Sequence, residues 1–376
     1  MGQGLNYLSR RPGGLQNLGK GTKYLPLVSV TEGESSMRII CALTFSMIIP
    51  LGAITAQIRS EDPVRAITKA FDDHQIVMVG DLHGNKQEYE LLRKLIASAD
   101  LAEKANDIVM EVGNASFQGA VDKYVAGEDV PFDQVQSAWR NSLLIGAASP
   151  VYEWLYAAVR DANSERPANR RMRILLCDPP IDWSKVNGFL DVEPFLSKQV
   201  AFCADAVTHE VIRKHRRALI LMGMAHLLRT PRGPASLERR LRAAGASTYL
   251  IVTGTNSVGQ TSEEFDRVDE RFQSLPSPIV LSLKGNWIGR LPALPVVTGG
   301  TALSPDPTTL AQGGDALLYL GPRDSLIAIN TTESDLAGSA YGREVTRRLS
   351  ALFGSGAEPF ATKRETPEFA SPTSSH

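Results

Sequence analysis

Five short apolar runs constrain the fold of this chain most strongly, because each is long enough for a buried strand and too short for a helix. Segments with apolar residues at helical spacing separate these runs. Such an alternation predicts an α/β fold, in which a mostly parallel sheet carries helices on both faces and an active-site crevice opens where the strands end. The runs are Ile76–Val79, Ile108–Met110, Arg173–Cys177, Ala218–Met222 and Thr248–Val252.

The segments between the runs predict the helices. Asn85, followed by Glu88 three residues later, resembles the capping box that opens a helix, and apolar residues then recur on one face as far as Ile96. Residues 196–215 predict one long helix. The other predicted helices lie near residues 116–126, 132–142, 150–163 and 236–244.

The chain changes character after the fifth run. From residue 276 short apolar stretches alternate with Gly and Pro, so residues 276–353 are interpreted as an elaboration packed on the same core. One α/β domain is therefore expected over residues 57–353. From Gly354 the composition turns to Gly, Ser, Pro and Thr, which predicts a disordered tail over residues 354–376.

An apolar run of 16 residues, Ile39–Ile54, stands behind a basic residue and ends in small residues. This pattern is typical of a secretory signal peptide, here residues 37–56 with cleavage after Ala56. Residues 1–36 would then be a non-native N-terminal extension. The alternative is an uncleaved anchor, which would be the expected contact with a membrane. The expected location is secreted or periplasmic.

Composition narrows the classes of function. A formal net charge of -1 gives no support to nucleic-acid binding, so a small molecule or a peptide is the expected partner. Three cysteines without a Cys-x-x-Cys pair exclude a disulfide framework and a zinc ribbon. Cys177 and Cys203 both lie in the expected mature chain and could pair in an oxidising compartment, if their Cα atoms come close enough.

Polar side chains with catalytic chemistry follow four of the five apolar runs. Because parallel strands end at one edge of a sheet, these side chains should meet in one crevice. Imidazoles with carboxylates are the ligand set for zinc, manganese or a similar divalent ion, and they also serve acid–base catalysis without metal. Taken singly, each has a plainer interpretation as a cap, a turn residue or a hydrogen-bonded core histidine. The residues are Asp81, His83, Glu111, Asp178, Asp182 and His226.

The predicted catalytic residues are His83, Glu111 and His226, and the same three with Asp81 form the predicted site for a divalent metal. A bound ion would lower the pKa of its water and polarise a carbonyl group. In the metal-free version His83 or Glu111 would be the general base.

Weaker predictions of substrate binding fall on Asp178, Asp182 and Arg140. The guanidinium of Arg140 suits an anionic substrate or an oxyanion. The plainer interpretation is that Trp139 and Arg140 form a half-buried structural pair.

Two motifs, Gly80–His83 and Gly223–His226, fit Gly-x-x-His, and Glu111 follows a strand between them. This ordered set resembles the superfamily that unites erythromycin esterase-like enzymes, TIKI/TraB proteins and ChaN-like haem-binding proteins. Asp81 stands where that group usually has Glu, which keeps a carboxylate but shortens its reach. Neighbouring stretches look like a bacterial secreted subgroup of uncertain function. The resemblance covers roughly residues 70–340.

The resemblance implies a ChaN/TIKI-like α/β domain and three kinds of activity. TIKI relatives are metal-dependent proteases, with the motif histidines and the Glu in the active site. Erythromycin esterase relatives hydrolyse a lactone, with His and Glu activating water. ChaN-like relatives bind haem and are linked to iron uptake. When the motifs are matched to this sequence, the resemblance assigns these roles to His83, Glu111 and His226. It also assigns a role to Asp81, which stands where the superfamily usually has Glu.

These observations predict a secreted hydrolase that cleaves an ester, lactone or amide with water activated by His and Glu or by a metal. The alternative is a haem- or iron-binding uptake protein, with His83, His226 or a Tyr as iron ligand. A second alternative is a non-catalytic interaction module. The reason is that Asp81 stands where the superfamily usually has Glu.

Overall fold

The α/β region is the part of the chain that the computed structural model describes, and all of the described residues belong to one unit, Ile54–His376. The predicted extension 1–36, the signal peptide 37–56 and the tail from residue 355 lie outside them. No helix in the described ranges is both long and apolar enough to span a bilayer. The described residues are 60–147, 149–229, 235–254, 269–274, 276–293, 308–329, 336 and 338–354.

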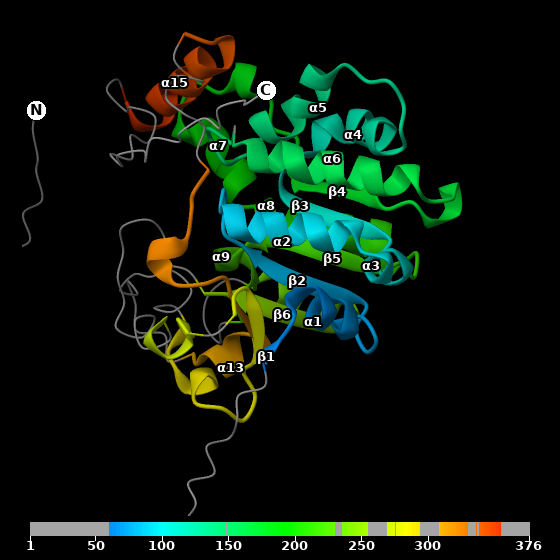
Figure 1. The fold of residues 1–376 in the computed structure, drawn as a ribbon. Helices are drawn as coiled ribbons and strands as arrows, with labels where there is room; N and C mark the ends of the chain where they lie inside the picture. The colour runs from blue at the N-terminus through cyan, green and yellow to red at the C-terminus, as the bar shows by residue number, and fades with distance from the viewer. Residues whose placement is uncertain are drawn as a thin grey trace, which may run out of the picture. The chain divides into compact units, whose positions relative to one another are not determined.

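An eight-stranded sheet lies at the centre of the fold, and its middle strands are parallel, which confirms the prediction (Figure 1). The spatial order is β1-β7-β8-β6-β2-β5-β3-β4, with parallel pairing from β8 to β4 and antiparallel pairing of β7 with β8 and β1. The strands are β1 Ser60–Glu61, β2 Ile76–Asp81, β3 Asp107–Asn114, β4 Arg173–Asp178, β5 Ala218–Gly223, β6 Thr248–Thr253, β7 Ile279–Ser282 and β8 Ala316–Tyr319.

Helices connect the strands, and several begin at a side chain that caps the first turn. Asn85 caps α2, Ser149 caps α6 and Ser236 caps α10. The helices are α1 Pro63–Ala70, α2 Lys86–Ala97, α3 Ala99–Lys104, α4 Gln118–Val125, α5 Phe132–Arg140, α6 Pro150–Ser164, α7 Phe189–Leu196, α8 Gln199–Val207, α9 Met224–Leu227, α10 Leu237–Ala243, α13 Leu310–Gly313 and α15 Ala340–Phe353.

Both faces of the sheet are buried, because successive residues of a strand point to opposite sides. Val77 and Val79 of β2 join a buried cluster with side chains of α2 and α6, which lie in front of the sheet in Figure 1. Ile76 and Met78 join a second buried cluster with side chains of α8 and α10. The predicted helix cover on both faces is confirmed.

The strands extend farther toward the crevice than their apolar runs. β2 continues through Asp81, β3 continues to Asn114 and β4 ends on Asp178. Asp81, Glu111 and Asp178 therefore lie within strands, where the hydrogen-bonded ladder holds their backbone, and not in the loops that follow.

The single long helix predicted over residues 196–215 is wrong. α7 ends at Leu196, α8 begins at Gln199, and a π-helical turn, Thr208–Ile212, follows α8. Pro194 lies in the last turn of α7 and has no N–H to donate, which weakens the helix there. The break places Gln199 at the start of a separate helix.

The region after residue 276 adds strands to the same sheet. β8 pairs in parallel with β6, and β7 pairs with β8. Leu281 and Leu317 are fully buried in the same cluster as Met78. The apolar stretches near 279–283 and 316–320 are thus core strands of the sheet.

Candidate active site

The carboxyl ends of β2, β5 and β3 lie side by side and bring together four of the predicted residues. Asp81 pairs with Gly223 across β2 and β5. Glu111 comes from β3, the next strand, beside a shift in the register between β3 and β4. Such irregularities re-aim side chains next to active sites. His83 follows β2, and His226 lies on α9 directly after β5.

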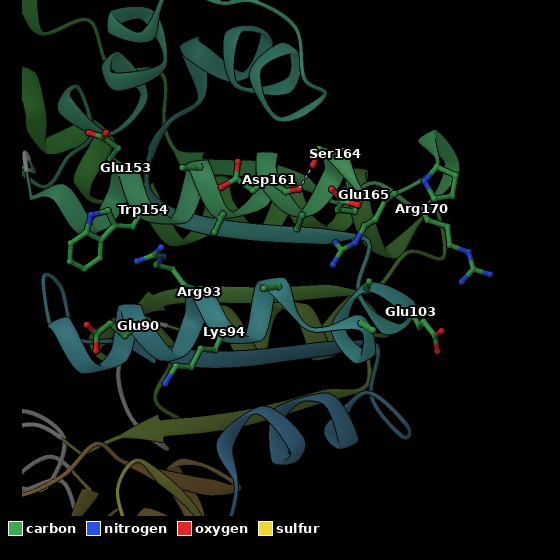
Figure 2. Close-up of a pocket in the computed structure, with 18 residues that line it drawn as sticks. Glu90, Arg93, Lys94, Glu103, Glu153, Trp154, Asp161, Ser164, Glu165 and Arg170 are labelled. Atoms are coloured by element: carbon green, nitrogen blue, oxygen red, sulfur yellow. Dashed lines mark hydrogen bonds between the residues drawn. The ribbon is translucent and has the colours of Figure 1, made fainter.

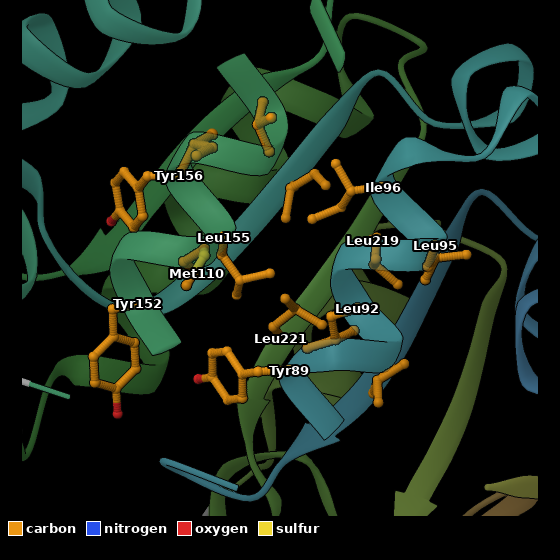
Figure 3. Close-up of a cluster of buried hydrophobic side chains, with 14 of the residues drawn as sticks. Tyr89, Leu92, Leu95, Ile96, Met110, Tyr152, Leu155, Tyr156, Leu219 and Leu221 are labelled. Atoms are coloured by element: carbon orange, nitrogen blue, oxygen red, sulfur yellow. The ribbon is translucent and has the colours of Figure 1, made fainter. Parts of the chain in front are cut away.

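Asp81 orients the ring of His83. Nδ1 of His83 lies 2.9 Å from Oδ2 of Asp81, and the Tyr89 hydroxyl donates to both oxygens of Asp81 at 3.1 and 3.0 Å. The ring of Tyr89 packs edge-on against Tyr152 between α2 and α6 (Figure 3). Nε2 of His83 is 3.9 Å from Oε2 of Glu111, too far for a hydrogen bond. His83 is therefore held through Nδ1, and Nε2 is left for other chemistry.

Glu111 orients the second imidazole in the same way. Nε2 of His226 lies 3.2 Å from Oε1 of Glu111, and the backbone N–H of Gly223 donates to Oε2. A Cβ on Gly223 would lie 3.2 Å from Oε2 of Glu111 and 3.3 Å from Nε2 of His83. Glycine at this position therefore keeps the space between the two groups open.

Asp178 lies behind Glu111 and is joined to it through Gln199. Nε2 of Gln199 donates to Oδ1 of Asp178 at 2.6 Å and lies 3.4 Å from Oε1 of Glu111. The backbone N–H of Leu143 donates to Oδ2 of Asp178 at 2.7 Å. Asp178 is almost fully buried. Asp178 therefore supports Glu111 through Gln199, and its contact with a substrate stays a prediction.

A disulfide connects this supporting layer to the strand. Cys177, the residue before Asp178, pairs with Cys203, one turn after Gln199, and their Cα atoms are 4.7 Å apart. The pairing that the sequence left open is thus formed in this structure, and it tethers the start of α8 to the end of β4.

Carboxylates and imidazoles occupy different depths in the site. The side chains of Asp81 and Glu111 are 2% and 9% exposed, whereas those of His83 and His226 are 32% and 30% exposed. The carboxylates therefore form the floor, and the two imidazoles form the part that a solute can reach.

The charges in the site act unequally on the two histidines. Burial acts to lower the pKa of His83, but the carboxylates of Asp81, Glu111 and Glu88 outweigh it and raise the pKa to about 10. Burial also acts to lower the pKa of His226, and the charge of His83 lowers it further. The hydrogen bond and the charge of Glu111 outweigh both effects and raise the pKa of His226 above its usual value. His83 is thus the more firmly protonated ring.

The carboxyl groups of the floor are also shifted. Burial acts to raise the pKa of Glu111, but its bonds to His226 and Gly223 and the charge of His83 bring the pKa below its usual value. Burial raises the pKa of Asp178 to about 7, with the charge of Glu111 adding to the effect and the Leu143 N–H opposing it. Glu111 is therefore the more acidic member of this pair.

Three supporting residues had no distinct signal in the sequence. Tyr89 lies on the buried face of α2 and resembled a core residue, while Gln199 fell inside the helix that proved to be divided. Glu88 was predicted as half of a capping box. Asn85 does cap α2, but the carboxylate of Glu88 accepts instead from the Leu82 N–H at 2.7 Å, and its other oxygen is buried without a partner.

The predicted metal site does not fit the arrangement of the donors. Among the described residues, no group of three or more His, Cys, Asp and Glu side chains is placed to hold a metal ion. Asp81 and Glu111 point at separate imidazoles, and Glu111 also accepts from the backbone of Gly223. Asp81 thus holds one nitrogen of His83, while Glu111 contacts His226 and lies 3.9 Å from the other nitrogen of His83.

Asp182 and Arg140 lie outside the cluster of Asp81, His83, Glu111 and His226. Asp182 is exposed, accepts from the N–H and hydroxyl of Ser184 and pairs with Lys185, which is the capping role that its plainer interpretation predicted. Arg140 ends α5, and its guanidinium lies over the ring of Tyr341 at 5.0 Å.

A large groove lies on the outer surface of α2, α3 and α6 and contains none of the predicted residues (Figure 2). Its volume is about 1290 Å³, and alanines of the three helices contribute to its lining. Arg93 of α2 lies over the ring of Trp154 of α6 at 5.6 Å. Charges of both signs line this groove, so its electrostatics favour neither an anion nor a cation.

No protein-family model and no curated protein sequence matches the chain. Solved structures similar to it include the type III effector HopBA1, at 12% identity and a TM-score of 0.40 over 72% of this chain and 100% of the effector. A protein from Bacillus cereus is 10% identical, with a TM-score of 0.47 over 71% of this chain and 93% of its own.

ChaN of Campylobacter jejuni, solved for its cofacial haem binding, is also among the neighbours. It is 12% identical, with a TM-score of 0.34 over 54% of this chain and 88% of ChaN. A ChaN protein is thus found among the similar structures, as the motifs predicted. These similarities are weak in both sequence and TM-score, and the chemistry follows from the site itself.

Proposed function

We propose that this protein is a hydrolase that cleaves an ester, lactone or amide with two carboxylate-oriented histidines. The observation that supports the proposal is the pair of dyads, Asp81–His83 and Glu111–His226, on adjacent strand ends with both rings partly exposed. A buried carboxylate that holds one nitrogen of an imidazole fixes the orientation of the ring and leaves the other nitrogen to exchange a proton with a reactant.

The two histidines take opposite roles in this proposal. Nε2 of His226 lies 3.2 Å from Oε1 of Glu111, so in this proposal the neutral ring carries its proton on Nε2, and Nδ1 accepts a proton from the attacking water. His83, held protonated by Asp81, donates from Nε2 to the oxygen or nitrogen of the leaving group. The carbonyl carbon gains the hydroxyl and loses the leaving group, and the proton returns from His226 to His83 through solvent.

This assignment differs from the expectation that His83 or Glu111 is the base. The raised pKa of His83 makes it a proton donor at neutral pH. Glu111 already accepts from His226 and Gly223, and its lowered pKa makes it a weak base. The base is therefore assigned to His226.

The experiment is a hydrolysis assay on a panel of chromogenic esters, lactones and peptide amides. His83→Ala and His226→Ala should each lower kcat roughly 10²- to 10⁴-fold, the usual contribution of a positioned acid or base. The control is His209→Ala, because His209 is an exposed histidine on the π-helical turn. Cleavage that survives intact in His226→Ala would contradict the proposal.

Two further measurements distinguish the proposed function from the metal-dependent and haem-binding alternatives that the sequence predicted. Chelation should leave the rate unchanged, and a rate that falls and returns with added zinc or manganese would favour the metal-dependent version. Hemin added to the protein should leave its Soret band unshifted, and a saturable shift lost in His83→Ala or His226→Ala would favour haem binding.

We also propose that the protein works in a secreted or periplasmic location on a small molecule or a peptide. The Cys177–Cys203 disulfide supports an oxidising compartment, because such bonds are rare in reducing ones. N-terminal sequencing of protein recovered from culture medium or periplasm should begin at Gln57, and an intact residue 40 would contradict cleavage of the predicted signal peptide.

A further inference from the structure

A second, smaller cavity lies where α5 ends and where α6 and α15 begin. Its volume is about 390 Å³, which lies in the range of small-molecule sites. We call it the Arg140 pocket. Its lining includes Arg140, Gln136, Ser149, Glu153, Ser339 and Tyr341.

Among the described lining residues, Arg140 is the one cation of this pocket, and it pairs with no described anion. Among the described residues its guanidinium makes no ion pair and no hydrogen bond, and Nε is buried without a partner. Only the ring of Tyr341 stacks on it, while its carbonyl accepts from Tyr341 and Arg348. A buried donor without a partner is unfavourable, so an anion that pairs with this guanidinium would be favoured.

The backbone around the pocket adds to the positive electrostatic potential of Arg140. The pocket adjoins the N-termini of two long helices, α6 with 15 residues and α15 with 14, whose caps are Ser149 and Ser339. Helix N-termini carry partial positive charge, which favours an anion beside them. The opposing group is Glu153, an exposed carboxylate in the first turn of α6.

Two hydrogen bonds through Ile329 connect the pocket to the turn after His83. The Ser149 hydroxyl donates to the carbonyl of Ile329, and the N–H of Ile329 donates to the carbonyl of Gly84 at 2.8 Å. Gly84 follows His83 in the chain. One backbone segment thus touches both the pocket and the turn that carries the proposed acid.

We propose that the Arg140 pocket binds an anionic group of the substrate, a carboxylate or a phosphate, and that the hydrolase prefers acidic esters, lactones or amides. Arg is suited to both anions because its planar fork donates two parallel hydrogen bonds. The link to the substrate rests on the proposed function, whereas binding of the anion does not.

Binding is tested first, without turnover, by calorimetric titration of the full chain with inorganic phosphate and with acetate. Arg140→Gln should weaken the preferred anion about 10- to 100-fold, as expected for loss of a charge-assisted pair. Arg140→Lys should retain part of the affinity, and Glu153→Gln should tighten binding about twofold because a nearby like charge is removed. The control is Arg93→Gln, which removes a cation from the groove on α2 and α6.

The comparison of phosphate with acetate shows whether the pocket prefers a phosphate or a carboxylate. No binding of either at millimolar concentration, or equal binding in Arg140→Gln, would overturn the proposal. Thermal unfolding of each variant shows that the fold is intact, and retained affinity in Arg140→Lys separates loss of charge from loss of packing on Tyr341.

Kinetics then test the link to the substrate, with two esters of equal length, one ending in a carboxylate and one in a methyl group. Arg140→Gln should raise KM for the acidic ester at least tenfold and leave the neutral ester unchanged. Equal effects on both esters would overturn the substrate assignment. If the wild type cleaves neither ester, the proposed function fails, while the titrations still decide whether the pocket binds an anion.

Discussion

Two histidines that look equivalent in the sequence differ because unequal charge surrounds them. His83 faces Asp81, Glu111 and Glu88, whereas His226 faces mainly Glu111 and is opposed by the charge of His83. A proton therefore stays on His83 at a pH where it leaves His226. This difference in pKa is what allows one ring to act as an acid and the other as a base.

The first prediction concerns the pH dependence of kcat/KM. The rate should rise as His226 loses its proton, at a pH above the usual value of 6.5, and fall near pH 10 as His83 loses its own. Asp81→Asn removes a charge that raises the pKa of His83, so the fall should move to lower pH. A full pH–rate profile checks this, and an unmoved alkaline limb in Asp81→Asn would contradict the role of Asp81.

The second prediction concerns Glu88, which is fully buried below the turn that carries His83. Burial and the charge of Asp81 raise the pKa of Glu88 well above its usual value, against the Leu82 N–H. Glu88→Gln should then change stability little, because an amide oxygen still accepts from Leu82. Glu88→Ala leaves that N–H unpaired and should cost about 1–3 kcal/mol in urea unfolding. Equal losses in the two variants would contradict the role of Glu88 as the acceptor for the Leu82 N–H.

At the scale of the elements, the end of β4 and the start of α8 form one supporting unit. The disulfide joins Cys177 to Cys203, and Gln199 contacts both Asp178 and Glu111. The division of the predicted long helix is what lets Gln199 reach the site. In one unbroken helix over residues 196–215, the packing of the whole helix would set the position of Gln199.

The third prediction follows from this tether. Cys177→Ala combined with Cys203→Ala should lower the free energy of unfolding by about 3 kcal/mol, the usual effect of opening a loop of 26 residues. It should also lower kcat/KM, since the start of α8 is no longer tied to β4. Reduction of the wild type should reproduce the loss of stability. A thiol assay that finds both cysteines free in native protein would contradict the pairing.

At the scale of the whole molecule, the sheet depends on strands that are far apart in the chain. β8 covers the edge of β6, and β7 covers β8. Without them the edge of β6 would be open, and buried side chains such as Leu250 and Val252 would lose their cover. An exposed apolar edge strand promotes association between molecules.

The fourth prediction tests this dependence by truncation. A chain that ends at residue 275 should be insoluble or form large aggregates by size-exclusion chromatography. A chain that ends at residue 354 should remain soluble and unfold at the wild-type temperature, since it keeps β7, β8 and α15. A soluble, cooperatively folded shorter chain would show that residues 276–353 are dispensable to the fold.

Local sequence was sufficient for the five strands β2 to β6 and for the shared edge of the sheet at which four of the predicted side chains lie. A run of apolar residues bounded by Gly or by polar residues must be buried on both faces, and parallel strands must end together, so Asp81, His83, Glu111 and His226 could be placed at one edge. The β–α alternation predicted the helix cover for the same reason.

Tertiary structure alone decided which of these groups touch. The spatial order places β5 between β2 and β3, and Gly223 of β5 has no side chain to fill the space between His83 and Glu111. Asp81 contacts His83, and Glu111 contacts His226. Tyr89 and Gln199 reach the site from helix faces that look like ordinary core. Asp182 turns outward to cap a turn. Contacts between residues far apart in the chain depend on strand order and helix packing, which no local pattern of residues encodes.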